Sequence, residues 1–381
     1  MQIDRTLVAY LACEIVIAII SALGNALIVI VFVRDRRLRT PTNLYVFSLA
    51  VTDLLTSTVA MPVYAFSMLT QKPRDFHACL YVNTLILTFC TVSILHLTAV
   101  SFDRYMAVVW RRKPVSHSRG MRHASILVAV AWILGGLIGC LPVMGWHSGV
   151  PAPSVATKCE FMKVVRMSYL LFLFYATIIT PTLIMLFFYI SIYHTVRAHN
   201  DRMLSVHYSL DTRISNRNGE NSFRNSKNGG KHEGDKEENV ENSMVNARFQ
   251  SMQQRQSAKT KRIIFSLVLV ILCFLVSWYP LYIMNAVAYY CTDCEMEAWW
   301  FYAPIILSHL SSAVNPFIYA RTMPGYKEAF IEALACKKSS AIPEDLADRS
   351  RNEGSKARMS IETQAAARPA IGGDSEEEEE E

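Results

Sequence analysis

Seven apolar stretches, each long enough to cross a lipid bilayer, constrain the fold of this chain more than any other feature. They cover approximately residues 7–33, 44–69, 80–109, 124–146, 169–196, 263–290 and 299–320. A helix of about 20 apolar residues spans the hydrocarbon core of a bilayer. Only 18% of the residues are charged, and these lie in blocks between the apolar stretches. Because backbone groups in lipid must be satisfied within each helix, we expect an all-α membrane protein, a seven-transmembrane helix bundle.

The distribution of Lys and Arg predicts how the bundle is oriented. Basic residues concentrate in the loops after the first and third stretches and at the start of the tail, for example Arg34, Arg36, Arg37, Arg39, Arg111, Arg112, Lys113, Lys337 and Lys338. The loops on the opposite side carry fewer. The positive-inside rule therefore places the N-terminus outside the cell and the C-terminus in the cytoplasm, as expected for a multi-pass protein of the plasma membrane.

Composition divides the chain into five regions. Residues 1–6 form a short extracellular N-terminus, and residues 7–321 form the seven-transmembrane domain. Residues 198–261 and 337–381 are polar and are predicted to be a disordered third intracellular loop and a disordered cytoplasmic tail. Between them, residues 322–336 place Tyr326, Phe330 and Leu334 at a spacing of four, which predicts a short amphipathic eighth helix on the membrane surface. Cys336 at its end is a candidate palmitoylation site, the alternative being an unstructured tail with a free thiol.

Four cysteines lie at segment ends or in loops on the predicted outer side, which is an oxidising environment. A bridge between Cys79 and Cys159 would tie the loop before the fifth stretch over the top of the third. Cys291 and Cys294 form a CxxC pair, which elsewhere indicates zinc or redox chemistry. With only two ligands and no second pair, a local disulfide fits better than zinc.

Ionisable residues inside the apolar stretches are costly and therefore mark candidate sites. Asp53 lies mid-membrane, with Ser93 and Asn315 at comparable depths, and the group could hold sodium or a proton and waters; the alternative is a protonated structural Asp. Glu14 and His309 fall in the outer halves of the first and seventh stretches. In a ring of seven helices these two stretches are neighbours, so we expect a hydrogen-bonded pair near a ligand pocket.

Two further features point to function. Trp278 precedes Pro280 by two residues and could lie at the floor of a pocket, or it could be an ordinary core aromatic. The third stretch ends in Asp103-Arg104-Tyr105. An adjacent Asp and Arg at the end of a lipid-length helix are costly, and such residues more often have a function than not.

These motifs together resemble the rhodopsin-like (class A) G-protein-coupled receptors over about residues 7–336. The matching motifs are Gly24-Asn25, Leu49-Ala50-Val51-Thr52-Asp53, Asp103-Arg104-Tyr105, Trp132, Trp278-Tyr279-Pro280 and Asn315-Pro316-Phe317-Ile318-Tyr319. The resemblance implies that Arg104 reaches a heterotrimeric G protein on activation while Tyr189 and Tyr319 swing inward. It also implies a sodium site at Asp53, Ser93 and Asn315, and receptor kinases and arrestin as further partners.

Within that family, the pocket positions are similar to those of adenosine receptors. By this resemblance Phe161 would stack on the purine, and Asn285 would bond its exocyclic amine and ring nitrogen. Ser308 and His309 would hold the ribose hydroxyls, with Glu14 orienting His309. Ile86, Leu87 and Trp278 would complete the ligand site. Three positions depart from the adenosine-receptor pattern, namely Cys90, Met162 and Tyr282.

Other ligands and functions fit the sequence less well. Ile86 stands where amine receptors carry an Asp, and His309 stands where opsins carry the retinal Lys. A class A receptor for a peptide or lipid remains open. An ion-coupled transporter that uses Asp53, Glu14 and His309 is disfavoured because no inverted repeat is apparent. The residues contain no nucleophile–base set, so we expect no enzyme activity. We also expect no cofactor beyond an allosteric sodium ion. Membrane lipids are expected as partners, and nucleic acid is not.

Overall fold

The computed structural model describes residues 5–110, 117–149, 159–198, 201–202, 205, 269, 272–291, 294, 296–323 and 325–335. These residues form helices and turns, with no β-strand among them beyond one isolated bridge between His147 and Val165. The bundle lies within a compact unit comprising residues 1–331. Cys336 and the predicted disordered tail lie outside the described residues, as does nearly all of 198–261.

The first three predicted spans are formed by five elements, with the turn η1 between the first two spans. Helix α1 covers Arg5–Arg34 and is followed by the 3₁₀ turn η1 (Arg36–Leu38). The second span is continuous through α2 (Pro41–Leu55), the π-helical segment η2 (Thr56–Ala60) and α3 (Met61–Thr70). The third is α4 (Phe76–Val108), whose N-cap Asp75 accepts a hydrogen bond from the Ala78 N–H.

The remaining spans follow in the same order as in the sequence prediction. The fourth is α5 (His117–Cys140), and the short α6 (Phe161–Val164) precedes the fifth. The fifth span, Met167–Ala198, includes α7 (Met167–Leu173) and the π-helical segment η3 (Phe174–Ile179). The sixth covers Leu272–Tyr290 in the described residues, the seventh is α10 (Ala298–Thr322), and α11 (Tyr326–Leu334) comes last.

Six of these helices are long and apolar enough to cross a membrane by length and composition. The seventh, α10, is more polar because it carries Ser308, His309, Ser311, Ser312 and Asn315. The fourth span was predicted over 124–146, and the helix lies earlier in the chain, since α5 ends at Cys140. Pro142 disfavours helical geometry in the residue before it, which accounts for this earlier end. Helix α5 also begins earlier than the predicted span, at His117, because the polar residues before position 124 are helical too.

Both π-helical segments lie beside prolines, η2 before Pro62 and η3 before Pro181. Such segments widen one turn of a helix and are frequent at functional sites. Hydroxyl groups satisfy carbonyls around them: Ser57 Oγ donates to the Asp53 carbonyl at 2.8 Å, and Thr177 Oγ1 donates to that of Leu173 at 2.7 Å. These side chains add hydrogen bonds to carbonyls where the helix is irregular.

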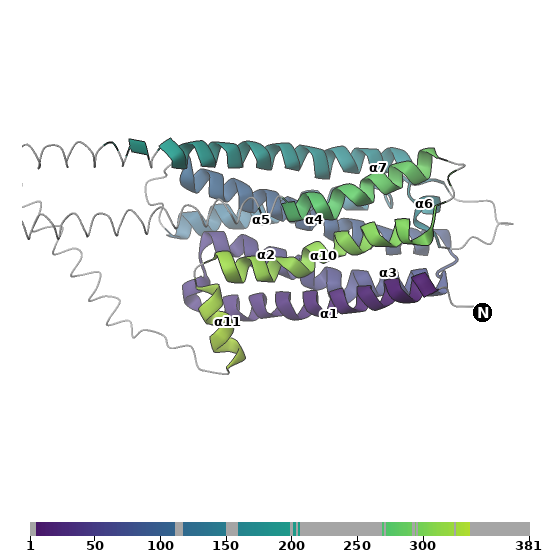
Figure 1. Ribbon diagram of the computed structural model, residues 1–381, viewed down its shortest axis with the longest axis horizontal. Helices are drawn as coiled ribbons and strands as arrows, with labels where there is room; N and C mark the ends of the chain where they lie inside the picture. Colours follow the sequence, from purple (N-terminus) through teal and green to yellow (C-terminus); the bar gives the residue numbers. More distant parts are fainter. Residues whose placement is uncertain are drawn as a thin grey trace, which may run out of the picture. The chain divides into compact units, whose positions relative to one another are not determined.

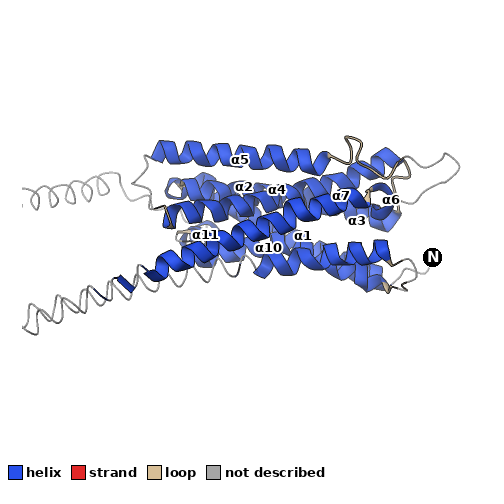
Figure 2. Ribbon diagram, turned by 90° about the horizontal axis from the view of Figure 1, so that it is seen from above, coloured by secondary structure: helices blue, strands red, loops and turns tan. Residues whose placement is uncertain are grey.

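Helix α4 packs against α2 and α5, and α1 packs against α2 and α10, as Figures 1 and 2 show. A Cβ atom on Gly24 would lie 2.8 Å from Cγ of Pro316, so glycine is what lets α1 approach α10 this closely. A buried chain of hydrogen bonds joins three helices. Trp132 Nε1 donates to Ser48 Oγ at 2.9 Å, and Ser48 Oγ lies 2.8 Å from His96 Nε2. His96 therefore has a packing role.

Candidate functional site

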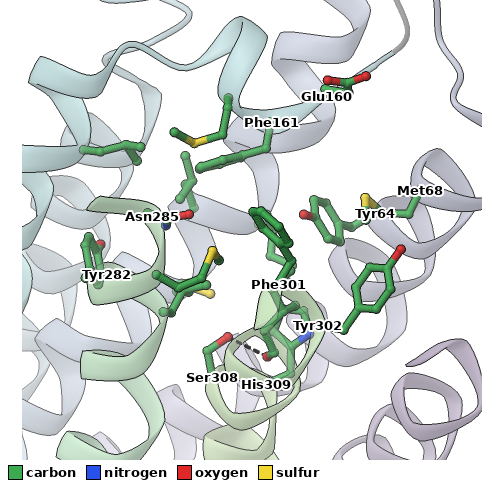
Figure 3. Close-up of a pocket in the computed structure, with 18 of the residues that line it drawn as sticks. Tyr64, Met68, Glu160, Phe161, Tyr282, Asn285, Phe301, Tyr302, Ser308 and His309 are labelled. Atoms are coloured by element: carbon green, nitrogen blue, oxygen red, sulfur yellow. Dashed lines mark hydrogen bonds between the residues drawn. The ribbon is translucent and has the colours of Figure 1, made fainter. Parts of the chain in front are cut away.

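A cavity of about 580 Å³ opens at the end of the bundle that carries Cys79 (Figure 3). Its volume falls in the range of small-molecule sites, which are mostly apolar with a few placed polar groups. No Lys or Arg is found among the described residues of its wall. Most of the sequence-predicted ligand residues line it: Ile86, Leu87, Phe161, Trp278, Asn285, Ser308 and His309.

Phe161 and Asn285 come from different elements and face the same part of this cavity (Figure 3). Phe161 begins α6, two residues after Cys159, whose disulfide holds this segment against the start of α4. Asn285 lies on the helix Leu272–Tyr290 and is buried at 8% exposure. An aromatic face and a side-chain amide with both donor and acceptor are thus placed around one space.

Glu14 and His309 are in direct contact between α1 and α10. His309 Nδ1 lies 3.0 and 2.8 Å from the two carboxylate oxygens of Glu14, and both side chains are buried. When Nδ1 donates to the Glu14 carboxylate, which accepts hydrogen bonds in its ionised form, Nε2 is left to meet a ligand. Glu14 does not itself line the cavity; it contacts His309, which does, as expected of a residue that orients His309.

Ser308 stands beside His309 in the cavity wall (Figure 3). Its hydroxyl donates to the Ile305 carbonyl at 2.7 Å, so its oxygen lone pairs are the part that can serve a ligand. Tyr282, a departure noted in the sequence, also lines the cavity and packs on Phe174 of η3, with ring centroids 5.2 Å apart.

Sequence reasoning missed three aromatic residues of the wall, Tyr64, Phe301 and Tyr302. Two of them could have been found from spacing, because Phe301 precedes Ser308, and Tyr302 precedes His309, by two helical turns. Residues seven apart lie on the same face of a helix.

Asp53 lies at the centre of a buried polar cluster. Its Oδ1 accepts hydrogen bonds from Ser93 at 3.0 Å and Ser312 at 2.9 Å, and its Oδ2 accepts one from Asn315 at 2.8 Å. The predicted set of Asp53, Ser93 and Asn315 is therefore brought together, with Ser312 as a fourth member. Asn25 adds a bond from Nδ2 to the Ser312 carbonyl, while its Oδ1 is buried with no partner within the described residues.

This donor set consists of oxygens, which suits a small hard cation. The Asp53 carboxylate and the hydroxyl oxygens of Ser93 and Ser312 would be available to such a cation once the hydroxyl protons point away from it. The chemistry of the cluster thus fits sodium, although it fits a hydrogen-bonded Asp as well.

At the opposite end of α4, Arg104 lies near two tyrosines from other helices. Its guanidinium interacts electrostatically with Tyr189 and Tyr319, and the Tyr189 hydroxyl is 2.5 Å from Ser101 Oγ. Arg104 also interacts electrostatically with Asp103, although no salt bridge joins the two among the described residues. Asp103 instead accepts a hydrogen bond from Thr42 at 2.7 Å, a contact that the sequence did not indicate.

Tyr105 completes this end of the helix. Its ring stacks on Phe188, with centroids 4.8 Å apart, and its hydroxyl accepts a hydrogen bond from Trp110 Nε1 at 3.3 Å. The Asp103-Arg104-Tyr105 motif thus contacts the second and fifth spans and interacts electrostatically with the seventh.

The four cysteines predicted to be oxidised are paired. Cys79 is joined to Cys159 and Cys291 to Cys294, each with a Cα–Cα distance of 5.5 Å. Asn83 Nδ2 lies 3.6 and 3.8 Å from the two sulfurs of the first bridge. Cys13, Cys90, Cys140 and Cys273 are free thiols.

Comparisons with known proteins agree with this geometry. Residues 24–319 match the model of the 7 transmembrane receptor (rhodopsin family). The human adenosine receptor A2a is 28% identical over 84% of this chain and 71% of its own length. The chicken adenosine receptor A2b is 29% identical over 86% of this chain and 89% of its own length. The dog adenosine receptor A2a is 28% identical over 84% of this chain and 71% of its own length.

The family match covers most of the chain, from within the first span to near the end of the seventh, which removes the transporter alternative. The chain therefore belongs to the rhodopsin family of G-protein-coupled receptors, and it is a multi-pass plasma-membrane receptor, not an enzyme, that couples a small-molecule ligand to a G protein.

Proposed function

We propose that this receptor binds adenosine in the cavity bounded by Phe161, Asn285, Ser308 and His309. The observation that carries the proposal is the meeting of these four residues, from three separate elements, around one cavity of about 580 Å³. Its relatives include proteins named adenosine receptors A2a and A2b.

The chemistry of the wall favours a nucleoside over a nucleotide. Phe161 offers a face for a flat heterocycle, and Asn285 can both donate to a ring nitrogen and accept from an exocyclic amine. Ser308 and His309 Nε2 can serve sugar hydroxyls. Phosphates are bound in proteins chiefly by Arg and Lys, and the described wall contains neither.

The proposed orientation places this cavity outside the cell. Cys159 lies both in the cavity wall and in a disulfide, which favours an oxidising environment at that end. Arg104, at the other end of α4, then faces the cytoplasm, where it would reach the G protein as Tyr189 and Tyr319 move inward. Adenosine would act by binding the active arrangement of the helices more tightly than the resting one.

The remaining proposals concern the membrane and its cytoplasmic side. Asp53, Ser93 and Asn315 would hold an allosteric sodium ion between the cavity and Arg104. Membrane lipids surround the bundle, α11 would lie on their surface, and Cys336 beyond it would carry a palmitoyl chain. Receptor kinases and arrestin would be further cytoplasmic partners, as in other receptors of this class.

A second-messenger assay in transfected cells tests the ligand. Losing the paired hydrogen bonds of Asn285 or the ring of Phe161 should each cost about 1–3 kcal/mol. Asn285→Ala and Phe161→Ala should therefore raise the adenosine EC50 about 5-fold to 150-fold. Val287→Ala serves as a matched control, because Val287 is on the same helix as Asn285 but is exposed on the outside of the bundle.

All variants are compared at equal surface expression, measured with an N-terminal epitope. AMP should be far weaker than adenosine on the wild-type receptor. A receptor that is silent to adenosine and responds to a peptide or lipid would overturn the ligand proposal, while leaving the family assignment in place.

A further inference from the structure

One end of the cavity, which we call the aromatic compartment, differs in character from the part around Asn285. It is lined by Tyr64 and Met68 of α3, Phe301 and Tyr302 of α10, Gln71 and Glu160. In Figure 3, Tyr64, Met68 and Tyr302 lie across Phe301 from Asn285, with Glu160 above them. Three aromatic rings and one carboxylate thus surround a space that the proposed adenosine contacts do not use.

Two rings of this compartment, Tyr302 and Tyr64, are held in place by their surroundings. Tyr302 stacks on Tyr10 of α1, with ring centroids 4.6 Å apart and an interplanar angle of 22°. Tyr10 is buried at 2% exposure and Tyr64 at 9%. Aromatic groups that are already fixed lose little freedom when a ligand arrives, so their π faces are preorganised.

The charge around the compartment is negative. Glu160 is the only acidic residue in the described cavity wall, and no Lys or Arg is part of that wall. Behind the rings, Glu14 interacts electrostatically with Tyr10 and Tyr64, although it is also paired with His309. Lys163 opposes this field, since its Nζ lies 3.0 Å from Glu160 Oε2, but both side chains are about half exposed and Lys163 does not line the cavity.

We propose that the aromatic compartment binds a small organic cation, an ammonium or quaternary ammonium group held against Tyr64, Phe301 and Tyr302 with Glu160 as its counter-ion. Cations are attracted to the faces of aromatic rings, and cages of such rings recognise quaternary ammonium ligands. A carboxylate at the rim adds a charge that an uncharged ligand cannot use. The site does not require adenosine to be the ligand, because it shares none of Phe161, Asn285, Ser308 or His309.

The rival interpretation is an apolar vestibule that accepts any apolar group. A cation site and an apolar vestibule differ in how strongly they bind two ligands that have the same shape and different charge. Choline and its uncharged isostere, in which carbon replaces the nitrogen, have the same shape and differ only in charge. A vestibule would bind the isostere at least as well, whereas a cation site would bind choline alone.

The test uses the purified full-length receptor in a non-ionic detergent and follows its apparent melting temperature. Choline chloride is titrated at constant ionic strength, balanced with NaCl, and the isostere is titrated in parallel. Choline should raise the melting temperature in a saturable way and the isostere should not. Asn285→Ala should keep the choline effect, which separates this result from the fate of the adenosine proposal.

Variants assign the effect to the compartment. Glu160→Gln and Tyr64→Leu should each raise the half-maximal choline concentration between about twofold and thirtyfold, the factor for one such contact. Tyr64→Phe keeps the ring and should keep binding, which guards against a folding defect in Tyr64→Leu. Lys163→Gln removes the competing cation and should tighten binding.

Glu297→Gln is the matched charge control, because Glu297 precedes α10 near the same end but is exposed and outside the cavity wall. It should leave choline binding unchanged. Equal stabilisation by choline and its isostere would overturn the proposal. So would an equal loss in Glu160→Gln and Glu297→Gln, which would mean that only the overall surface charge matters.

Discussion

Replacing Gly135 with alanine should force α5 away from α4, whereas the same replacement at the neighbouring Gly136 should not. A Cβ atom on Gly135 would lie 2.6 Å from Cγ2, 2.8 Å from Cα and 3.0 Å from N of Val92. Two of these three atoms belong to the backbone of α4 and cannot rotate away. A Cβ atom on Gly136 would meet nothing within 4 Å.

The magnitude follows from these distances. Ordinary contacts of a Cβ begin at 3.4 Å, so the contact with Val92 Cα at 2.8 Å requires a local separation of the two helices by about 0.6 Å. Overpacking of this kind costs about 1–3 kcal/mol. Gly136→Ala should instead gain about 0.5–1 kcal/mol from its lower backbone entropy in the unfolded chain. Gly135→Ala has the same entropy gain, so the two variants should differ by the overpacking cost alone, about 1–3 kcal/mol in the free energy of unfolding.

Thermal inactivation of the detergent-solubilised receptor measures the difference. Gly135→Ala should melt several degrees below Gly136→Ala, at about 2–4 °C per kcal/mol. Adding Val92→Ala to Gly135→Ala removes Cγ2 but leaves Cα and N, so it should restore only part of the loss. Equal melting temperatures for the two glycine variants would refute the close approach of α4 and α5 at this point.

Two further predictions concern the polar cluster and the disulfides. If sodium binds beside Asp53, the adenosine EC50 of the wild-type receptor should change with NaCl at constant ionic strength, and Asp53→Asn should abolish this dependence; an unchanged dependence in the variant would exclude the site. Cys79→Ser opens a bridge between residues 80 apart and should cost about 4 kcal/mol, whereas Cys291→Ser opens one between residues 3 apart and should cost under about 2 kcal/mol. Surface expression should consequently fall much further for Cys79→Ser, and a similar fall for both would contradict the loop-length argument.

The spans were predictable from sequence because a bilayer leaves the backbone few alternatives. Apolar length determines where each helix lies, and the cost of a buried charge marks Asp53, Glu14 and His309 in advance. Depth counted along each helix was enough to expect Glu14 beside His309, and the structure places them 2.8 Å apart. The end of α5 was harder, because apolar residues continue past Cys140 and only Pro142 signals the break.

What the sequence could not supply was the rotation of each helix about its axis. Every span is apolar on several faces, so periodicity does not say which aromatic side chains turn inward. Tyr64 and Tyr302 belong to different spans, and they share a cavity only because the bundle turns both of them inward. The same holds for Thr42 and Asp103, which are hydrogen-bonded although a whole span lies between them in the chain.

One face of α10 links the three places where polar groups gather. His309 is in the cavity wall, Ser312 and Asn315 bond Asp53, and Tyr319 lies near Arg104, so the spacing along the helix is three, three and four residues. Residues at this spacing follow a single stripe of a helix. A shift of α10 imposed at His309 is therefore felt at Asp53 and at Arg104.

Pro316 makes such a shift less costly. A proline has no N–H, so it cannot donate to the carbonyl four residues earlier, which belongs to Ser312. Asn25 of α1 donates to that carbonyl instead, at 3.1 Å, and Gly24 beside it admits the proline ring. The Ser312 carbonyl therefore has its hydrogen bond from α1 and does not depend on a bond within α10 at this point. The two halves of α10 can consequently change their angle without exposing an unsatisfied carbonyl to lipid, and this is the physical reason to expect the bundle to transmit through α10.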